Sequence, residues 1–286
     1  MRLIHCVALS RHCAGPSGMA DSIWDTIAKT LLLGKFHAAM QAAADLVQRA
    51  RTPGDEAGIP LESALDLLAR FHVCQGAYDE ALPLHQEGLS VAERRFGDMS
   101  EEFAWFASRL ACNLMNLGQI DEAASCCARE TAIIERLGGE NHPHYWRALS
   151  NLADVCIQRG DVAAAEDLRV RSLRLRIEQY GNRSCIAACG LSALAGSYRR
   201  AGRWRPAMKA LEQVISIYAC NSWRGDVLHW RFYAAALRNL GSVYEHVGEI
   251  AAARDQFSKS VNVFSEFLDA EHPAVRDARD QLNKVS

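Results

Sequence analysis

Apolar and small residues recur along this chain at fixed distances from a series of glycines. Each of these glycines is followed two positions later by an apolar residue and five positions later by an alanine. The glycines are Gly34, Gly76, Gly118, Gly160, Gly202 and Gly248, and successive members are 42, 42, 42, 42 and 46 residues apart. Spacing this regular predicts a chain assembled from repeated structural units.

Two further columns, both before the glycine, keep the same phase from the second repeat onward. Eight positions before the glycine stand Leu68, Leu110, Leu152, Leu194 and Leu240, and seven before it stand Ala69, Ala111, Ala153, Ala195 and Gly241. Five positions after the glycine stand Ala39, Ala81, Ala123, Ala165, Ala207 and Ala253. This pattern predicts one helical hairpin per repeat, because a left-handed glycine ends the first helix cheaply and small residues let the paired helices approach closely.

The stretches "HPHYWRALSNLADVCIQRGDVAAAED" and "RNLGSVYEHVGEIAAARDQF" resemble the tetratricopeptide repeat (TPR) family, and the 42-residue spacing resembles its kinesin-light-chain variety. The resemblance spans about residues 20–286. It implies an all-α superhelical solenoid of about six hairpins. A second His-Pro, at residues 272–273, begins half a repeat, which predicts a C-terminal capping helix over about 272–286.

We therefore expect a single solenoid domain over residues 19–286. A clean helical pattern begins at Met19, in "MADSIWDTIAKTLLLG", and the first repeat lacks the Leu/Ala pair, as expected of an end repeat. Residues 1–18 make a poor signal peptide, and we interpret them as a disordered lead or an over-extended start.

Composition narrows the function classes further. The chain has 286 residues, 49% of them hydrophobic, and a net charge of −2, which indicates no general bias toward nucleic acid or anionic membranes. No apolar run approaches the roughly 18–20 residues of a membrane span. Ten cysteines without any CxxC pair favour free, buried thiols in a reducing cytosol over a disulfide framework. We expect a cytoplasmic protein.

Charge is distributed unevenly along the chain. Residues 54–102 hold eleven acids and three bases, whereas residues 169–209 hold ten bases and one acid. The simpler interpretation is that both sets lie on solvated outer faces. The alternative is a bipolar molecule that steers an acidic segment to repeats four and five, or that stacks head to tail on itself. RNA binding is disfavoured, because aromatic residues do not interleave with the bases.

Candidate catalytic and metal-binding chemistry has simpler explanations. His142-Pro143-His144 is interpreted as a helix start, with Pro143 in the first turn, at the phase where Ser100 and Ser184 stand as N-caps. The alternative, a metal site, lacks a third ligand. Cys185 and Cys189 make at most half a site on one helix face. GxxxxGK, GxGxxG, HExxH and GxSxG motifs are absent, so we expect no enzyme, no cofactor and no metal.

The resemblance implies that the first helix of each hairpin lines a concave face, at positions 13, 10, 9, 6, 3 and 2 before the turn glycine. The polar and aromatic residues at these inner positions, the candidate partner-binding groove, are Ser63, Asp66, Arg70, Trp105, Ser108, Arg109, Asn116, Arg147, Ser150, Asn151, Asp154, Gln158, Ser192, Arg199, Arg200, Arg238, Asn239, Ser242, Glu245 and His246. Amides and arginines suit an extended peptide, since they hydrogen-bond backbone carbonyls and carboxylates. The alternative is a solvated inner face without a ligand.

The function that this implies is a scaffold or adaptor that binds a protein partner's peptide or helix, with an acidic segment on the partner as one option. An alternative is a regulatory sensor whose curvature changes when it binds a peptide or small ligand. An enzyme with an unrecognised site is a third option.

Overall fold

The computed structural model describes residues 36–52, 59–220, 229–267 and 273–285. Within these residues every regular element is a helix, and the predicted all-α fold is confirmed. The predicted helix from Met19, the turn glycine Gly34 and the lead over residues 1–18 lie outside the described residues.

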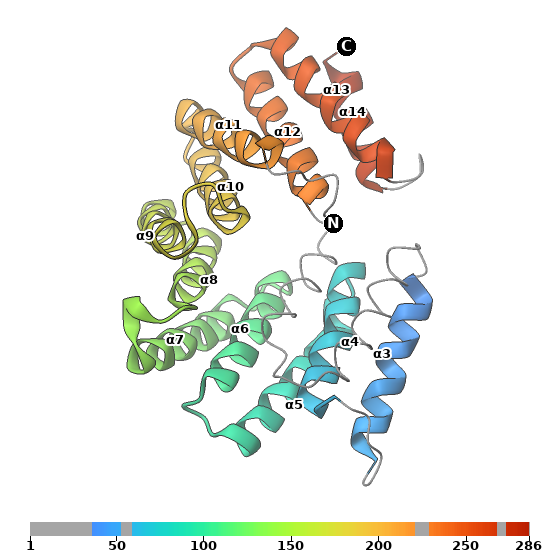
Figure 1. Ribbon diagram of the computed structural model, residues 1–286, viewed down its shortest axis with the longest axis vertical. Coiled ribbons are helices and arrows are strands. Elements are labelled where there is room, and N and C mark those ends of the chain that lie inside the picture. Colours follow the sequence, from blue (N-terminus) through green and yellow to red (C-terminus); the bar gives the residue numbers. More distant parts are fainter. Residues whose placement is uncertain (1–35, 53–58, 221–228, 268–272, 286) are drawn as a thin grey trace. The chain divides into compact units, whose positions relative to one another are not determined.

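The helices fall into two compact units, Met1–His142 and Pro143–Ser286, within each of which consecutive helices pack against one another. Figure 1 labels them in chain order. The first unit contains α3 (Phe36–Arg51), α4 (Leu61–Gln75), α5 (Tyr78–Phe96), α6 (Glu101–Asn116), α7 (Ile120–Leu137) and the short 3-10 helix η1 (Gly139–Asn141). The second contains α8 (Tyr145–Gln158), α9 (Val162–Tyr180), α10 (Cys185–Arg200), α11 (Trp204–Cys220), α12 (His229–His246), α13 (Ile250–Phe267) and α14 (Pro273–Lys284).

Each hairpin turns at the glycine that the sequence indicates. The φ angles of Gly76, Gly118, Gly160, Gly202 and Gly248 are 79°, 78°, 83°, 68° and 83°, in the left-handed region where a side chain would be strained. At the first of these turns, the Gly76 amide donates to the Val73 carbonyl and the Ala77 amide donates to the His72 carbonyl. Carbonyls at the end of the helix are satisfied in this way, and the chain reverses direction.

The small-residue columns lie in the helix crossings, as predicted. Alanines five positions after the turn glycine, among them Ala81 and Ala165, are 0% exposed, and so are Ala69 and Ala153 seven positions before it. In the last hairpin the second column carries Gly241, and a Cβ there would lie 2.7 Å from Cε1 of Phe257. Because a large phenyl ring fills this crossing, only glycine fits opposite it.

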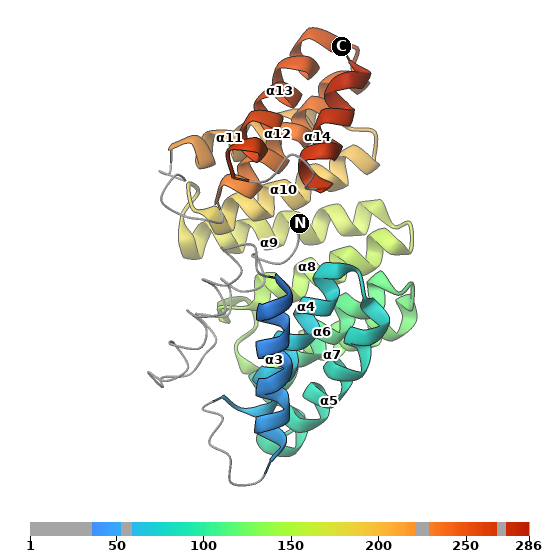
Figure 2. The same ribbon diagram turned by 90° about the vertical axis from the view of Figure 1, so that its right-hand side faces the viewer.

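Helix α14 closes the C-terminal hairpin at the position predicted for a cap. Its Val275 and Ala278 are 0% exposed and join a core cluster with Trp230 and Phe264. Figure 2 shows α14 beside α13, against which it packs. The Arg254 side chain also donates from Nη2 to the Val285 carbonyl, at 3.0 Å, beyond the end of the helix.

The prediction that Pro143 occupies the first helical turn is wrong by two residues. Helix α8 begins at Tyr145, whereas α6 and α10 begin at the residue directly after their caps, Ser100 and Ser184. The chain passes through η1 and then through an extended His142, with φ −72° and ψ 131°. A residue before proline favours this extended geometry, which Ser100 and Ser184 also adopt. The difference lies at His144, whose φ of −108° and ψ of 5° make it the N-cap residue, so the helix starts after it. His142 itself is buried, and its Nε2 lies 3.6 Å from a Glu101 carboxylate oxygen.

Candidate protein-binding surfaces

The predicted inner residues all lie on the first helices of their hairpins, but they differ in exposure. Four are buried: Asp66, Arg70, Ser108 and Asn151. Four are exposed: Asn116, Gln158, Arg200 and His246. The remaining twelve are half-buried: Ser63, Trp105, Arg109, Arg147, Ser150, Asp154, Ser192, Arg199, Arg238, Asn239, Ser242 and Glu245. Side chains of the second and third groups remain accessible to a partner.

In the first unit, the inner positions converge on a buried ion-pair cluster. Arg70 Nη1 donates to Asp66 Oδ2 at 3.3 Å, and Nε of Arg109, from the next hairpin, lies 3.6 Å from Asp66 Oδ1. The Arg109 guanidinium also stacks 4.3 Å from the ring centroid of Trp105. Burial acts to raise the pKa of Asp66, but Arg109 and Arg70 together hold this pKa below its usual value. The cluster therefore joins α4 to α6 and is mainly internal.

Sequence analysis missed the fourth member of this cluster, His85 on α5. His85 is 3% exposed, and neither of its ring nitrogens hydrogen-bonds to any described residue. Burial lowers the pKa of His85 to about 4, so the imidazole is neutral at pH 7. The repeat position of His85 could have indicated its burial. It lies nine residues after Gly76, where later hairpins place Cys127, Leu211 and Phe257, all buried.

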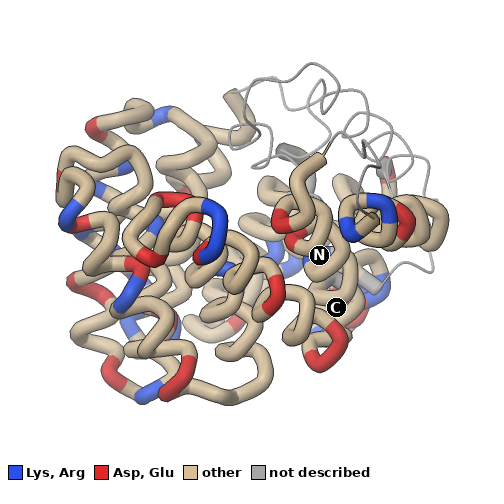
Figure 3. The backbone as a smooth tube through the Cα atoms, turned by 90° about the horizontal axis from the view of Figure 1, so that it is seen from below, with Lys and Arg blue, Asp and Glu red and all other residues tan. Residues whose placement is uncertain are grey.

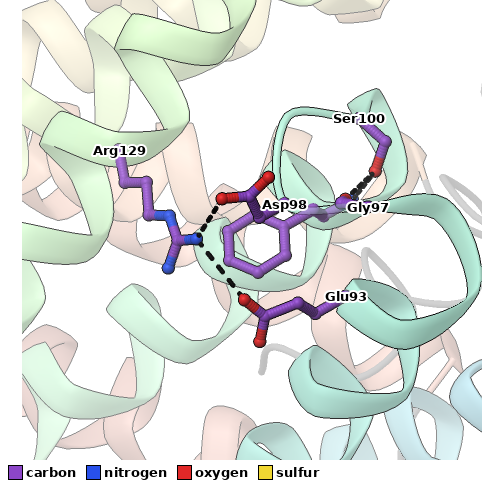
Figure 4. A network of polar contacts seen from close by, with 6 residues as sticks. Glu93, Gly97, Asp98, Ser100 and Arg129 are labelled. Carbon is purple, nitrogen blue, oxygen red and sulfur yellow. Dashed lines mark hydrogen bonds and ion pairs between the residues drawn. The ribbon is translucent and has the colours of Figure 1, made fainter.

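A bridge of polar contacts links two hairpins of the same unit (Figure 4). Arg129 on α7 reaches Asp98 at 3.4 Å and Glu93 at 3.7 Å, and its guanidinium lies 4.1 Å from the ring centroid of Phe103. Ser100 caps α6 beside it by accepting from the Phe103 amide at 3.1 Å. These contacts link neighbouring repeats and engage part of the acidic segment over residues 54–102.

In the second unit, the inner residues of α8 are held by two arginines that sequence analysis did not single out. Arg169 Nη2 donates to Asp154 at 2.6 Å, and Arg176 Nη2 donates to Ser150 at 3.0 Å. Arg176 also stacks 4.1 Å from the ring centroid of Trp146, while burial lowers its pKa to about 10. The expectation that the basic segment lies on solvated outer faces is therefore wrong for Arg169 and Arg176, each 7% exposed.

A cationic group lies on α10 and α12. Arg199 Nη1 donates to Asn239 Oδ1 at 3.3 Å, and Arg238 forms an ion pair with Asp277 of α14. Burial lowers the pKa of Arg199, and the positive charges of Arg238 and Arg200 lower it further. Three arginines that repel one another at inner positions create a positive potential suited to a carboxylate.

An aromatic pair links α11 and α12 in the same unit. Trp204, two residues after the turn glycine of its hairpin, lies against His246, two residues before the next turn glycine. Their ring centroids are 4.0 Å apart and the ring planes are tilted by 32°. Trp204 is half-buried and His246 is exposed, so the imidazole is the accessible part of the pair.

The described residues contain no cluster of three or more histidine, cysteine or acidic side chains suited to a metal ion. Seven cysteines whose side chains the structure describes are free thiols: Cys112, Cys126, Cys127, Cys156, Cys185, Cys189 and Cys220. Of these seven, Cys127 is buried, Cys220 is exposed and the other five are half-buried. At Cys189, the sulfur lies 3.7 Å from the Tyr218 hydroxyl, and burial raises the pKa of the thiol.

Among the helices that the structure describes, none is both apolar and long enough to span a bilayer. Lysines, arginines and acids are interspersed along the backbone (Figure 3).

Comparison with known proteins supports the repeat assignment. Models of the tetratricopeptide repeat family match residues 62–101, 102–178 and 146–219, more than half of the chain. A curated relative, Protein KINESIN LIGHT CHAIN-RELATED 1 of Arabidopsis thaliana, is 23% identical over 228 residues. That alignment covers 78% of this chain but 36% of the plant protein, so the chain spans about a third of its relative's length.

Solved structures share the fold. BtubC (BKLC) from P. vanneervenii superposes with a TM-score of 0.64 at 20% identity, covering 81% of this chain and 91% of that one. A putative kinesin light chain with nearly identical TPR-like repeats, from Podosopora anserina, superposes with a TM-score of 0.57 at 20% identity, covering 71% and 94%. The chain therefore belongs to the tetratricopeptide repeat family.

Proposed function

We propose that this chain is a protein–protein interaction scaffold that binds a partner peptide or helix along the inner positions of its first helices. Proteins of the repeat family generally mediate protein–protein interactions. The observation that carries the proposal is the cationic group on α10 and α12, where Arg199, Arg200 and Arg238 gather. The proposal assigns no catalytic step to the chain and places it in the cytoplasm.

The cationic group favours a partner with an acidic segment. Arg200 is exposed and Arg199 is half-buried, so a partner carboxylate can accept a forked pair of hydrogen bonds from either guanidinium. Arg238 is already paired with Asp277, which offsets its charge, so Arg199 and Arg200 supply most of the attraction. The Trp204–His246 pair between α11 and α12 offers a ring surface for a further side chain of the partner.

A charge reversal at Arg199 and Arg200 tests the proposal. The Arg199→Glu, Arg200→Glu variant is used to capture partners from the protein's own lysate, and the bound proteins are quantified by mass spectrometry against the unaltered chain. We expect the acidic partners to be lost, because two attractive charges become repulsive.

The matched control is Arg205→Glu with Lys209→Glu, the same change in charge on exposed residues of the second helix α11. Retention of the same partners by this control shows that position, not net charge, decides binding. Retention of the partners by both variants contradicts the proposal.

A further inference from the structure

Helix α9 has its polarity exchanged relative to the other second helices. Nine residues after the turn glycine the other hairpins bury His85, Cys127, Leu211 and Phe257, and sixteen residues after it they bury Ala92, Ile134, Tyr218 and Phe264. In α9 these two core positions hold Arg169 and Arg176. The arginines are seven residues apart, so both lie on one side of the helix.

The neighbouring positions show the reverse exchange. Ten residues after the turn glycine the other hairpins have Gln86, Ala128, Glu212 and Ser258, and seventeen residues after it they have Glu93, Glu135, Ala219 and Ser265. In α9 these two positions hold Val170 and Ile177, which are 46% and 36% exposed. Apolar side chains therefore face solvent only one residue away from arginines that face the core.

This exchange lowers the stability of the folded state in two ways, one for each face of the helix. Burying a guanidinium requires compensating contacts, and α9 needs Asp154, Ser150 and the Trp146 ring to provide them. Exposing Val170 and Ile177 also forgoes the stabilisation that their burial would bring. Contact with a partner would recover the stabilisation that these two exposed side chains forgo.

The exposed residues follow a heptad. Val170, Leu173, Ile177 and Tyr180 have the 3-4-3 spacing of a and d positions, and Tyr180 is 40% exposed. Leu173 is partly buried and connects the row to the core of the unit. Helix α9 packs against α8 and α10, while Val170, Ile177 and Tyr180 of this row are exposed. We call these four residues the α9 seam. Such a seam fits one further helix with its own apolar a and d residues.

Charge around the α9 seam selects the occupant. Residues 169–183 hold five arginines and one acid, but Arg169 and Arg176 face the core. The other three, Arg171, Arg174 and Arg183, are exposed, and Glu178 lies 3.7 Å from Arg174 in an exposed pair that contributes little. Two α9 seams facing each other would bring like charges together, which disfavours a symmetric dimer through this helix. A helix with glutamates or aspartates beside its apolar row has the complementary charge.

We propose that the α9 seam is a second docking surface, separate from the inner positions, which binds an acidic amphipathic helix of a partner protein in coiled-coil-like packing. The arginines at its edge orient the partner helix and exclude basic ones, while Val170 and Ile177 supply the apolar contact.

Two synthetic helical peptides test this proposal on the full chain. Both have three heptads with leucine at a and d, and they differ in having glutamate or lysine at e and g. Fluorescence anisotropy measures binding of each peptide. We expect the unaltered chain to bind the glutamate peptide at least about tenfold more tightly than the lysine peptide. High ionic strength weakens that binding.

Substitutions then locate the site. Val170→Gln with Ile177→Glu introduces the residues found in the hairpin of Gln86 and Glu93, and it should abolish binding without changing the melting temperature. The matched control, Ala128→Gln with Ala219→Glu, makes the same residues at the same repeat positions on other helices and should bind as the unaltered chain does. Arg171→Glu with Arg174→Glu should reverse the preference in favour of the lysine peptide.

Several outcomes overturn the proposal. These are no binding of the glutamate peptide, equal binding of both peptides, and glutamate-peptide binding that survives Val170→Gln with Ile177→Glu. Binding to phosphatidylserine vesicles that this double substitution abolishes also overturns it, since it identifies a membrane surface as the occupant. The Arg199→Glu, Arg200→Glu variant should bind the glutamate peptide as the unaltered chain does. The proposal for the α9 seam and the proposal for the inner positions can therefore be refuted separately.

Discussion

The environment of a single buried residue in this protein depends on the side chains that the neighbouring helices place around it. His85 illustrates this, because it occupies a core column in which the other hairpins place Cys127, Arg169, Leu211 and Phe257. Its two ring nitrogens are desolvated and make no hydrogen bond to the described residues. A buried polar group without a partner costs stability.

Replacing His85 with leucine should therefore stabilise the protein. We expect His85→Leu to raise the free energy of unfolding by about 1–3 kcal/mol, since the desolvation cost disappears and Leu211 shows that the column accepts leucine. Urea unfolding monitored by circular dichroism measures the change. Unchanged or reduced stability would show that the imidazole has a compensating role.

The same substitution should change how stability depends on pH. Burial lowers the pKa of His85 from 6.5 to about 4, so between these values the unfolded chain binds a proton that the folded chain excludes. Acidification from pH 6.5 toward 4 should then lower the free energy of unfolding, and His85→Leu should remove part of that loss.

Gly241 is required by Phe257, and this pair gives a second test at the scale of residues. Gly241→Ala puts a Cβ at 2.7 Å from the phenyl ring and should cost about 1–3 kcal/mol of stability, measured by urea unfolding. Adding Phe257→Leu recreates the Ala195/Leu211 pair of the preceding hairpin. The double variant should be less destabilised than the two single effects added together, and simple additivity would contradict the proposed clash.

At the scale of elements, helix starts depend on local capping as much as on packing. Ser184 caps α10 by accepting from the Ala187 amide at 3.1 Å, as Ser100 caps α6. Helix α8 has no such cap: its start is delayed to Tyr145, and His144 makes no capping hydrogen bond through its side chain.

Removing a serine cap should therefore destabilise its hairpin. We expect Ser184→Ala to cost about 1 kcal/mol, measured as a shift in the midpoint of urea unfolding, while Ser184→Asp should retain the stability because aspartate also caps. Equal losses in both variants would mean that the serine hydroxyl acts through another contact, such as its 2.8 Å bond to the Gly181 carbonyl.

At the scale of the whole molecule, each helix draws its stability from its immediate neighbours. Helix α12 packs between α11 and α13, whereas α14 packs mainly against α13 and touches α12 only through side chains such as Trp230 and Arg238. Stability in such an array is a sum over hairpins and their interfaces, so a helix with less contact to its neighbours opens more readily than one packed between two helices.

Hydrogen exchange should show this difference. We expect the amides of α14 to exchange before those of α12, measured by mass spectrometry on the intact chain. Val275→Asp, which places a charge at a residue that is 0% exposed, should accelerate exchange in α14 and α13 while leaving α10 largely protected. Uniform acceleration across all helices would instead indicate one cooperative unit.

The sequence by itself determined the repeat. Turn glycines such as Gly118, the alanines of the helix crossings and the position of the capping helix all follow from local rules of backbone and packing. Because these rules recur every 42 residues, alignment of the chain with itself reveals them.

Only the tertiary structure decided the side-chain environments. That Asp66 and Arg109 pair in the interior, that Arg176 stacks on Trp146, and that Val170 faces solvent each depend on residues from different helices. A repeat pattern specifies which positions face inward, but the partner across the interface determines whether a charge can stay there. The sequence therefore placed the predicted inner residues on the first helices of the hairpins, and the structure showed which of their side chains are exposed.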